Sequence, residues 1–204
     1  MKLLLENWRK YLLFENIETA TRLSIFDFDE TIAFTEGHIN VLNKETGEKF
    51  QTRTQEEYDA IKDDDKYEFD FSPLDVVHNA TENPNITAIL RDRLQDPNTQ
   101  VMILTARKQI SIDDIHRVLQ TFDRPIKADD IIMIGVEGEN KGQYIYDNIL
   151  LSYKNIKEVE FYDDSPDNIR DVNHTKKQIQ KERSDINFSV YLVVHGNPEI
   201  SSID

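Results

Sequence analysis

Short apolar runs recur along the chain from residue 22 onward, and the last four are separated by segments with apolar residues at three- and four-residue spacing. Such runs are typical of buried strands, and such spacing is typical of helices that cover a sheet. The alternation predicts an α/β fold, a Rossmann-like parallel sheet flanked by helices. The expected strands are Leu23–Phe28, Val101–Leu104, Ile131–Ile134, Val159–Tyr162 and Val190–Val194, and the expected helices are 108–122, 141–153 and 166–183.

The long interval from Thr31 to Gln100 differs in character from the rest of the chain. His38–Leu42 and Lys49–Thr52 flank a turn-rich segment and predict a hairpin. Helices are expected at 55–61 and at 85–94, the second of which rejoins the core. We therefore expect a small cap or flap, inserted at about residues 32–84 after the first strand, in a domain that spans residues 22–204.

Residues 1–21 predict a separate amphipathic helix, because their apolar side chains fall at helical spacing. Two interpretations stay open: the helix packs on the domain behind it, or it is a tail that docks the chain to a partner. Leu-x-Glu sequences at 4–6 and 13–15 are similar to processing sites in capsid-targeting propeptides of large tailed phages. This similarity suggests a phage-encoded, virion-associated protein.

Composition removes several classes of function. The chain has no cysteine, which excludes a thiolate nucleophile and a Cys-ligated metal site. Its 24 basic and 39 acidic residues give a formal charge of −15, which opposes binding to duplex DNA or to an anionic membrane. No apolar run approaches the roughly 20 residues that cross a bilayer. We expect a cytoplasmic protein without a membrane partner.

Two acidic pairs follow expected strands. Asp27 and Asp29 stand two residues apart after the first strand, and Asp163 and Asp164 follow the fourth. A sheet ordered 3-2-1-4-5 would set these strands side by side, so all four carboxylates would converge at the carboxyl edge. Oxygen ligands without thiolate or dominant imidazole select Mg²⁺, which commonly shares its shell with a substrate phosphate.

The two intervening strands end near residues suited to phosphate. Thr105 closes the second strand, and Lys141 follows the third, where a hydroxyl and an ammonium can bind phosphate oxygens. Arg107 either contacts the phosphate or leaving group or faces solvent. Three other lysines are alternatives to Lys141, namely Lys127, Lys154 and Lys157.

Taken in order, these residues resemble the four motifs of the haloacid dehalogenase-like (HAD) superfamily of phosphohydrolases. The first motif, Asp-x-Asp-x-Thr, is similar to Asp27, Asp29 and Thr31. The remaining three are similar to Thr105, Lys141 and the pair Asp163-Asp164. The resemblance covers about residues 22–195, and four matches in order at successive strand ends are specific.

The resemblance implies phosphoryl transfer through an aspartyl-phosphate. Asp27 would be the nucleophile and Asp29 the general acid and base. Mg²⁺ would be held by the Asp27 carboxylate, the Asp29 backbone carbonyl and a carboxylate of the fourth motif. That last ligand is Asp164 supported by Asp163, or else Asp163 paired with Asp167.

The expected function is Mg²⁺-dependent hydrolysis of a phosphomonoester. The small insert leaves an open site that suits a nucleotide or a polynucleotide-end phosphate, whereas the net charge favours a small molecule. The alternative is a catalytically retired HAD-like binding or structural protein, docked to a larger assembly by its N-terminal helix.

Overall fold

A six-stranded sheet forms the centre of the protein in a computed structural model, which describes residue 17 and residues 19–201. The strand order is β8-β7-β1-β9-β10-β11, in which β11 runs antiparallel to β10 and the other neighbours are parallel. The mixed α/β fold expected from the sequence is confirmed. The strands are β1 Arg22–Phe26, β7 Thr99–Thr105, β8 Ile131–Gly135, β9 Glu158–Asp163, β10 Asn187–Val194 and β11 Asn197–Ile200.

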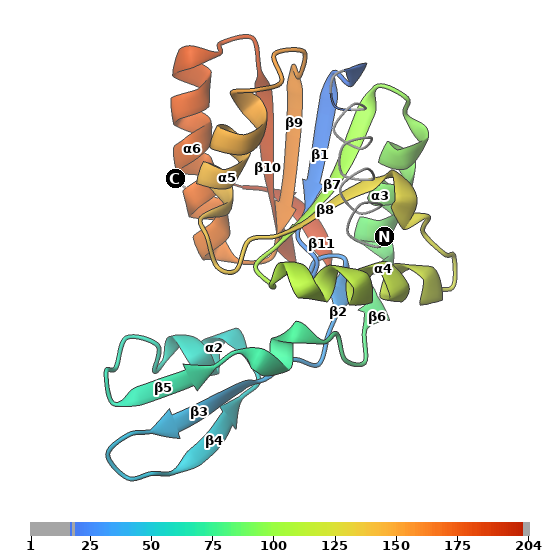
Figure 1. Cartoon of the computed structure of the whole chain (residues 1–204). Helices are drawn as coiled ribbons and strands as arrows, with labels where there is room; N and C mark the ends of the chain where they lie inside the picture. The colour runs from blue at the N-terminus through green and yellow to red at the C-terminus, as the bar shows by residue number, and fades with distance from the viewer. Residues whose placement is uncertain (1–16, 18, 202–204) are drawn as a thin grey trace, which may run out of the picture.

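Strand β1 lies in the middle of this sheet, between strands that are distant in sequence. Arg22 is level with Thr99 of β7 on one side and with Glu158 of β9 on the other. Because all three strands are parallel, their carboxyl ends meet at the same edge (Figure 1). This register brings the residues that follow β1, β7 and β9 together.

Helices cover both faces of the sheet, and each face has its own buried cluster. Successive side chains of a strand point to opposite faces, so neighbouring residues of β1 belong to different clusters. Ile25 belongs to a buried cluster with Ile17 and the apolar side chains of α5 and α6. Phe26 belongs to the other cluster, with residues of α3 and α4. The helical segments are α3 Pro84–Gln95, α4 Ile112–Thr121, α5 Lys141–Ile145, a π-helical turn at Tyr146–Leu150 and α6 Pro166–Glu182.

An insert of residues 33–82 lies beyond the carboxyl edge of the sheet, joined to the core by the short pair β2 and β6 (Figure 1). Its own sheet has the order β4-β3-β5. The expected hairpin corresponds to β3 and β4, whereas the sequence analysis foresaw neither β5 nor β11. The insert contains β2 Ala33–Phe34, β3 Ile39–Asn43, β4 Lys49–Thr52, α2 Gln55–Asp59, β5 Tyr67–Asp70, the 3₁₀ turn Ser72–Asp75 and β6 Thr81–Glu82.

The end of the expected N-terminal helix belongs to the core. Ile17 is fully buried, and Asn155 donates a hydrogen bond to its carbonyl oxygen at 2.6 Å. Residues 1–16, with both Leu-x-Glu sequences, lie outside the described residues, so docking by this helix stays a prediction. Among residues 17 and 19–201, no helix is both long and apolar enough to cross a membrane.

Candidate active site

A buried lysine joins two of the expected acidic residues at the carboxyl edge of the sheet. The Lys141 Nζ atom lies 2.5 Å from Asp27 Oδ1 and 2.8 Å from Asp163 Oδ2. The side chains of Lys141, Asp27 and Asp163 are 2%, 9% and 0% exposed. Charges this deeply buried persist only with opposite charges in contact, so the three groups form one unit with a fixed geometry.

Asp164 completes what we call the carboxylate cluster, defined as Asp27, Asp163 and Asp164. Each of the three offers an oxygen that lies within 4.8 Å of the others. Burial raises the pKa of Asp27 well above its ordinary value, an effect that Lys141 opposes and the neighbouring carboxylates reinforce. Burial and the charge of Asp163 raise the pKa of Asp164 to about 7. One ammonium therefore leaves an excess of negative charge, which a bound cation would relieve.

The oxygens of the carboxylate cluster suit a hard divalent cation. Both oxygens of Asp163 already accept hydrogen bonds, Oδ1 from Ser165 N at 2.9 Å and Oδ2 from Lys141. Asp164 accepts from the Thr31 hydroxyl through one oxygen, at 3.3 Å. Asp164 and Asp27 thus have more freedom to coordinate a metal than Asp163 does, which agrees with a supporting role for Asp163.

Lys141 reaches the cluster because of how α5 begins. Asn140 caps the helix, with its side-chain oxygen accepting from Gln143 N at 2.8 Å, so Lys141 occupies the first helical position. The next residue, Gly142, lies where a Cβ atom would stand 2.5 Å from Thr175 Oγ1 of α6. Only glycine permits this close approach, which presses the start of α5 against the core.

The carboxylate of Asp29 is not one of the clustered groups, contrary to the expectation that four carboxylates converge, although its charge still acts on Asp27. Arg107 holds Asp29 with two parallel hydrogen bonds, each of 2.8 Å, and the Thr35 hydroxyl donates to it at 2.6 Å. Strand geometry ends at Phe26, and Glu30 adopts a φ of 52° in the turn that follows. Alternation of side chains therefore does not extend as far as Asp29.

Arg107 connects this carboxylate to the insert, and the alternative of a solvent-facing side chain is wrong. The residue is 6% exposed, and its guanidinium also donates to the carbonyl oxygens of Leu74 and Val76. Its backbone N–H donates to the hydroxyl of Thr105 at 3.2 Å. Because the Thr105 hydroxyl only accepts in that bond, it retains a proton to donate to a phosphate oxygen.

The remaining candidates lie apart from the carboxylate cluster. Asp167 is 54% exposed and pairs with Arg170 and Lys62, so the pairing of Asp163 with Asp167 is not formed. The alternative lysines are exposed, and one of them bonds Asp185 at 2.5 Å. Lys127, Lys154 and Lys157 are these alternatives.

Asn168 is a further member of the site that the sequence analysis missed. Its side-chain nitrogen lies 3.0 Å and 3.1 Å from the two oxygens of Asp163. The available signal was its position in the first turn of α6, after the N-cap residue Ser165. A polar side chain there faces the preceding strand end, where it can fix a carboxylate.

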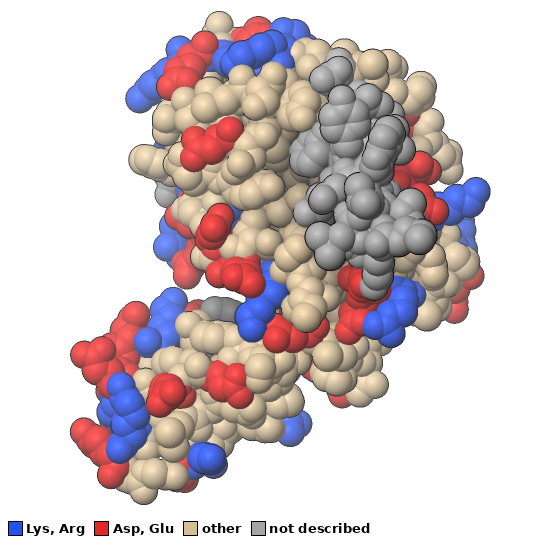
Figure 2. Space-filling model, viewed as in Figure 1, with Lys and Arg blue, Asp and Glu red and all other residues tan. Residues whose placement is uncertain are grey.

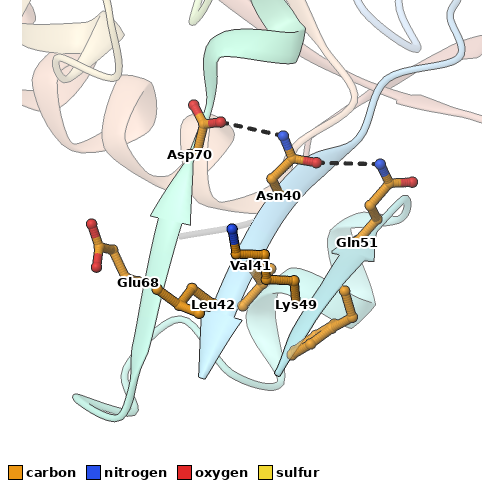
Figure 3. A pocket seen from close by; sticks show the side chains of 8 residues that line it. Asn40, Val41, Leu42, Lys49, Gln51, Glu68 and Asp70 are labelled. Carbon is orange, nitrogen blue, oxygen red and sulfur yellow. Dashed lines mark hydrogen bonds between the residues drawn. The ribbon is translucent and has the colours of Figure 1, made fainter. Parts of the chain in front are cut away.

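The insert and the core are separated by a hollow with acidic and basic side chains along its rim (Figure 2). A cavity of about 610 Å³ lies elsewhere, on the open face of the insert sheet (Figure 3). Asn40 bridges Gln51 and Asp70 there, with both hydrogen bonds at 3.2 Å. That cavity contains none of the candidate catalytic residues.

Comparison with known proteins identifies one family. A family model described as HAD domain family 1 in Swiss Army Knife RNA repair proteins matches residues 72–204. The matched segment contains Thr105, Lys141 and the Asp163-Asp164 pair, whereas Asp27 and Asp29 precede it. No curated protein and no solved structure matches the chain.

Proposed function

The chain belongs to HAD domain family 1 of the Swiss Army Knife RNA repair proteins, and from this membership we propose that it is a Mg²⁺-dependent phosphomonoester hydrolase. Its substrate would be the terminal phosphate of a nucleotide or of an RNA end. The observation that carries the proposal is the Lys141 ammonium, which bridges Asp27 and Asp163 inside the carboxylate cluster. The ammonium keeps a carboxylate ionised as a nucleophile, and the surplus carboxylates would hold the cation that lets this anion approach an anionic substrate.

Asp27 would attack the phosphorus with a carboxylate oxygen and form an aspartyl-phosphate as the ester oxygen leaves. Lys141 supports this role because its positive charge, 2.5 Å from Asp27 Oδ1, opposes protonation of the nucleophile. Thr105 lies fully buried at the end of β7, where its hydroxyl would donate to a phosphate oxygen. Together these groups would orient the phosphate for attack in line with the leaving oxygen.

Asp29 would handle the proton. Protonated Asp29 would donate its proton to the leaving oxygen, and the resulting carboxylate, held by Arg107, would take a proton from the water that attacks the aspartyl-phosphate. This second step releases inorganic phosphate, restores Asp27 and leaves Asp29 protonated for the next cycle. The two hydrogen bonds from Arg107 fix the plane of this carboxylate. Its side chain is 32% exposed, so the leaving group and water can both reach it.

The metal would be held by Asp27, Asp164 and the backbone carbonyl oxygen of Asp29, with Asp163 in support. The fit rests on the donor set, which consists of oxygen atoms with surplus negative charge. Bound at these oxygens, Mg²⁺ would neutralise phosphate charge and so allow a carboxylate to approach.

The proposed substrate class draws on two observations. The family description names RNA repair proteins, in which phosphate ends of RNA are a natural target. The insert is small, consisting of a three-stranded sheet, one short helix, a 3₁₀ turn and the strand pair that joins it to the core. A nucleotide at the end of a chain could therefore enter beside it.

The test compares hydrolysis of 4-nitrophenyl phosphate and of adenosine 3′-monophosphate, each with Mg²⁺ and with EDTA. We expect turnover that requires Mg²⁺, and Asp27→Asn should lose at least about 10³-fold because the nucleophile is removed. Asp167→Asn is the matched control, since Asp167 lies just after the neighbouring strand β9 but is 54% exposed and pairs with Arg170. Full activity of Asp27→Asn, or turnover in EDTA, would contradict the proposal.

A further inference from the structure

Three aromatic side chains of the insert form a cluster that we call the aromatic platform, consisting of Tyr58, Phe69 and Phe71. The ring of Tyr58 meets those of Phe69 and Phe71 edge-on, with centroid distances of 5.3 Å and 5.9 Å. Phe69 and Phe71 lie 6.3 Å apart with their planes inclined by 34°. Phe71 nevertheless stays 41% exposed. The platform thus holds one ring in a defined orientation and leaves part of it open to solvent.

The platform is connected to the active site through Arg107. Phe71 immediately precedes the 3₁₀ turn Ser72–Asp75, and its carbonyl accepts from Leu74 N at 2.9 Å. Leu74 in turn accepts from Arg107, which holds Asp29. This chain of hydrogen bonds connects Phe71 to the carboxylate of Asp29 through Leu74 and Arg107.

A second contact ties the other side of the platform to the core. Lys62, four residues after Tyr58, lies 3.7 Å from Asp167. Asp167 belongs to the first turn of α6, three residues after Asp164. The insert therefore contacts the loop after β7 through hydrogen bonds of the buried Arg107, and contacts α6 through one partly exposed pair.

The surroundings favour a flat and uncharged group over a second phosphate. The two cations of the site are already engaged, Lys141 by Asp27 and Asp163 and Arg107 by Asp29. A further phosphate beside them would meet carboxylates. A nucleobase needs no charge, and stacking on an aromatic ring holds any of the bases because each has a π face.

Resting on the proposed function, we infer that the aromatic platform is the base subsite of this enzyme: the base of the terminal nucleotide stacks on Phe71 while its phosphate reaches Asp27. The site would then recognise a nucleotide through its phosphate and its base, with little preference among bases. A phosphate ester without a ring would use only the core residues.

Two substrates distinguish base binding at the platform from phosphate hydrolysis at the core: adenosine 3′-monophosphate, which has a base, and glycerol 2-phosphate, which has none. Phe71→Ala should lower kcat/KM for the nucleotide about 10-fold, as expected for the loss of one stacked ring, and leave glycerol 2-phosphate unchanged. Phe71→Trp, which keeps an aromatic face and the packing on Tyr58, should retain nucleotide activity. Phe50→Ala is the matched control, because Phe50 is a 36% exposed ring of the same insert that contacts Tyr67 instead.

Several outcomes would overturn the inference. Equal losses on both substrates would mean that Phe71 only supports the insert, and no loss on either would mean that the base lies elsewhere. If the wild-type protein hydrolyses neither substrate, the proposed function fails and calorimetric titration decides the inference by itself. Weaker binding of adenosine 3′-monophosphate to Phe71→Ala, with binding of inorganic phosphate unchanged, would then support the platform, and equal binding to both proteins would refute it.

Discussion

The polar side chains at the centre of the core site are buried, whereas those on the open face of the insert sheet are exposed to solvent. In the core, Asp27, Lys141 and Asp163 are buried and hold one another by charged hydrogen bonds. On the insert, Asn40 and Asp70 form a hydrogen bond in the open. A buried charge tolerates one arrangement, because an unmatched charge in a low dielectric is costly, whereas solvated groups exchange partners freely. The buried unit of the core therefore has one fixed geometry, whereas the solvated polar groups of the insert can rearrange.

The largest effect expected from the difference between core and insert is a change in the stability of the metal-free protein with pH. An unfolded aspartate has a pKa near 3.9, and burial raises the pKa of Asp164 to about 7. The folded state therefore binds the proton more tightly, so stability of the metal-free protein falls as pH rises from about 4 to about 7 and then levels off. Asp164 contributes at most about 4 kcal/mol to this loss, reduced because solvent partly reaches it. Asp27 adds to the loss, because burial raises its pKa as well. Urea unfolding in EDTA at pH 5 and pH 8 measures it.

Mg²⁺ competes with the proton, so it should stabilise the protein more at pH 8 than at pH 5. Asp164→Asn is the control for both effects, since an amide has no carboxyl proton to lose and should reduce the pH dependence to the part that comes from Asp27. Equal stabilisation by Mg²⁺ at the two pH values would show that the metal binds elsewhere.

A smaller effect is expected at the junction between core and insert. Lysine cannot reproduce the two parallel bonds of a guanidinium, so Arg107→Lys should leave Asp29 poorly oriented. Loss of an oriented acid costs about 10²-fold when the leaving group needs a proton. We expect a loss of that size with glycerol 2-phosphate and a much smaller one with 4-nitrophenyl phosphate, whose leaving group departs without protonation.

The same comparison of aryl and alkyl esters can contradict the role of Arg107 as the residue that orients Asp29. The comparison uses kcat/KM, which reports the step that releases the leaving group, because kcat also includes hydrolysis of the aspartyl-phosphate that both esters share. Equal losses of kcat/KM on the aryl and alkyl esters would mean that Arg107 acts on the phosphate itself rather than through Asp29. Circular dichroism of the variant provides the control for folding, since Arg107 is buried.

The smallest effect is expected where the insert touches α6. Lys62 and Asp167 are 3.7 Å apart and both reach solvent, so their pairing is weak. Lys62→Ala should change kcat/KM by less than about twofold and leave the unfolding midpoint unchanged. A loss as large as that of Arg107→Lys would mean that the insert is as rigidly fixed as the core, contrary to the comparison.

The order of the apolar runs was enough to predict the core strands and the neighbourhood of Asp27, Lys141 and Asp163. In a parallel sheet the ends of strands necessarily share an edge, so position in the sequence becomes position in space. Strand β11 escaped prediction because it is a short edge strand that contains Pro198. Strand β5 escaped because it has only four residues, two of them acidic.

The orientation of Asp29 could not be predicted in the same way. It depends on the turn at Glu30 and on Arg107, which is 78 residues away in sequence. Asn168 presents a similar case, since its contact with Asp163 follows from the position of α6 after β9. Side chains that serve a site through tertiary contacts carry no periodic signal.

The central position of β1 has a consequence for synthesis of the chain. Arg22 of β1 pairs with Thr99, which is synthesised 77 residues later, and with Glu158, which is synthesised 136 residues later. Both edges of β1 can be paired only after the second of these has been made. At roughly 5–20 residues per second, the second interval lasts roughly 7–27 s on the ribosome. For that time the nascent chain carries an apolar strand with a free edge, which is a template for association with other chains. The central position of β1, which brings the candidate site residues together in the finished protein, therefore leaves the unfinished chain exposed to association.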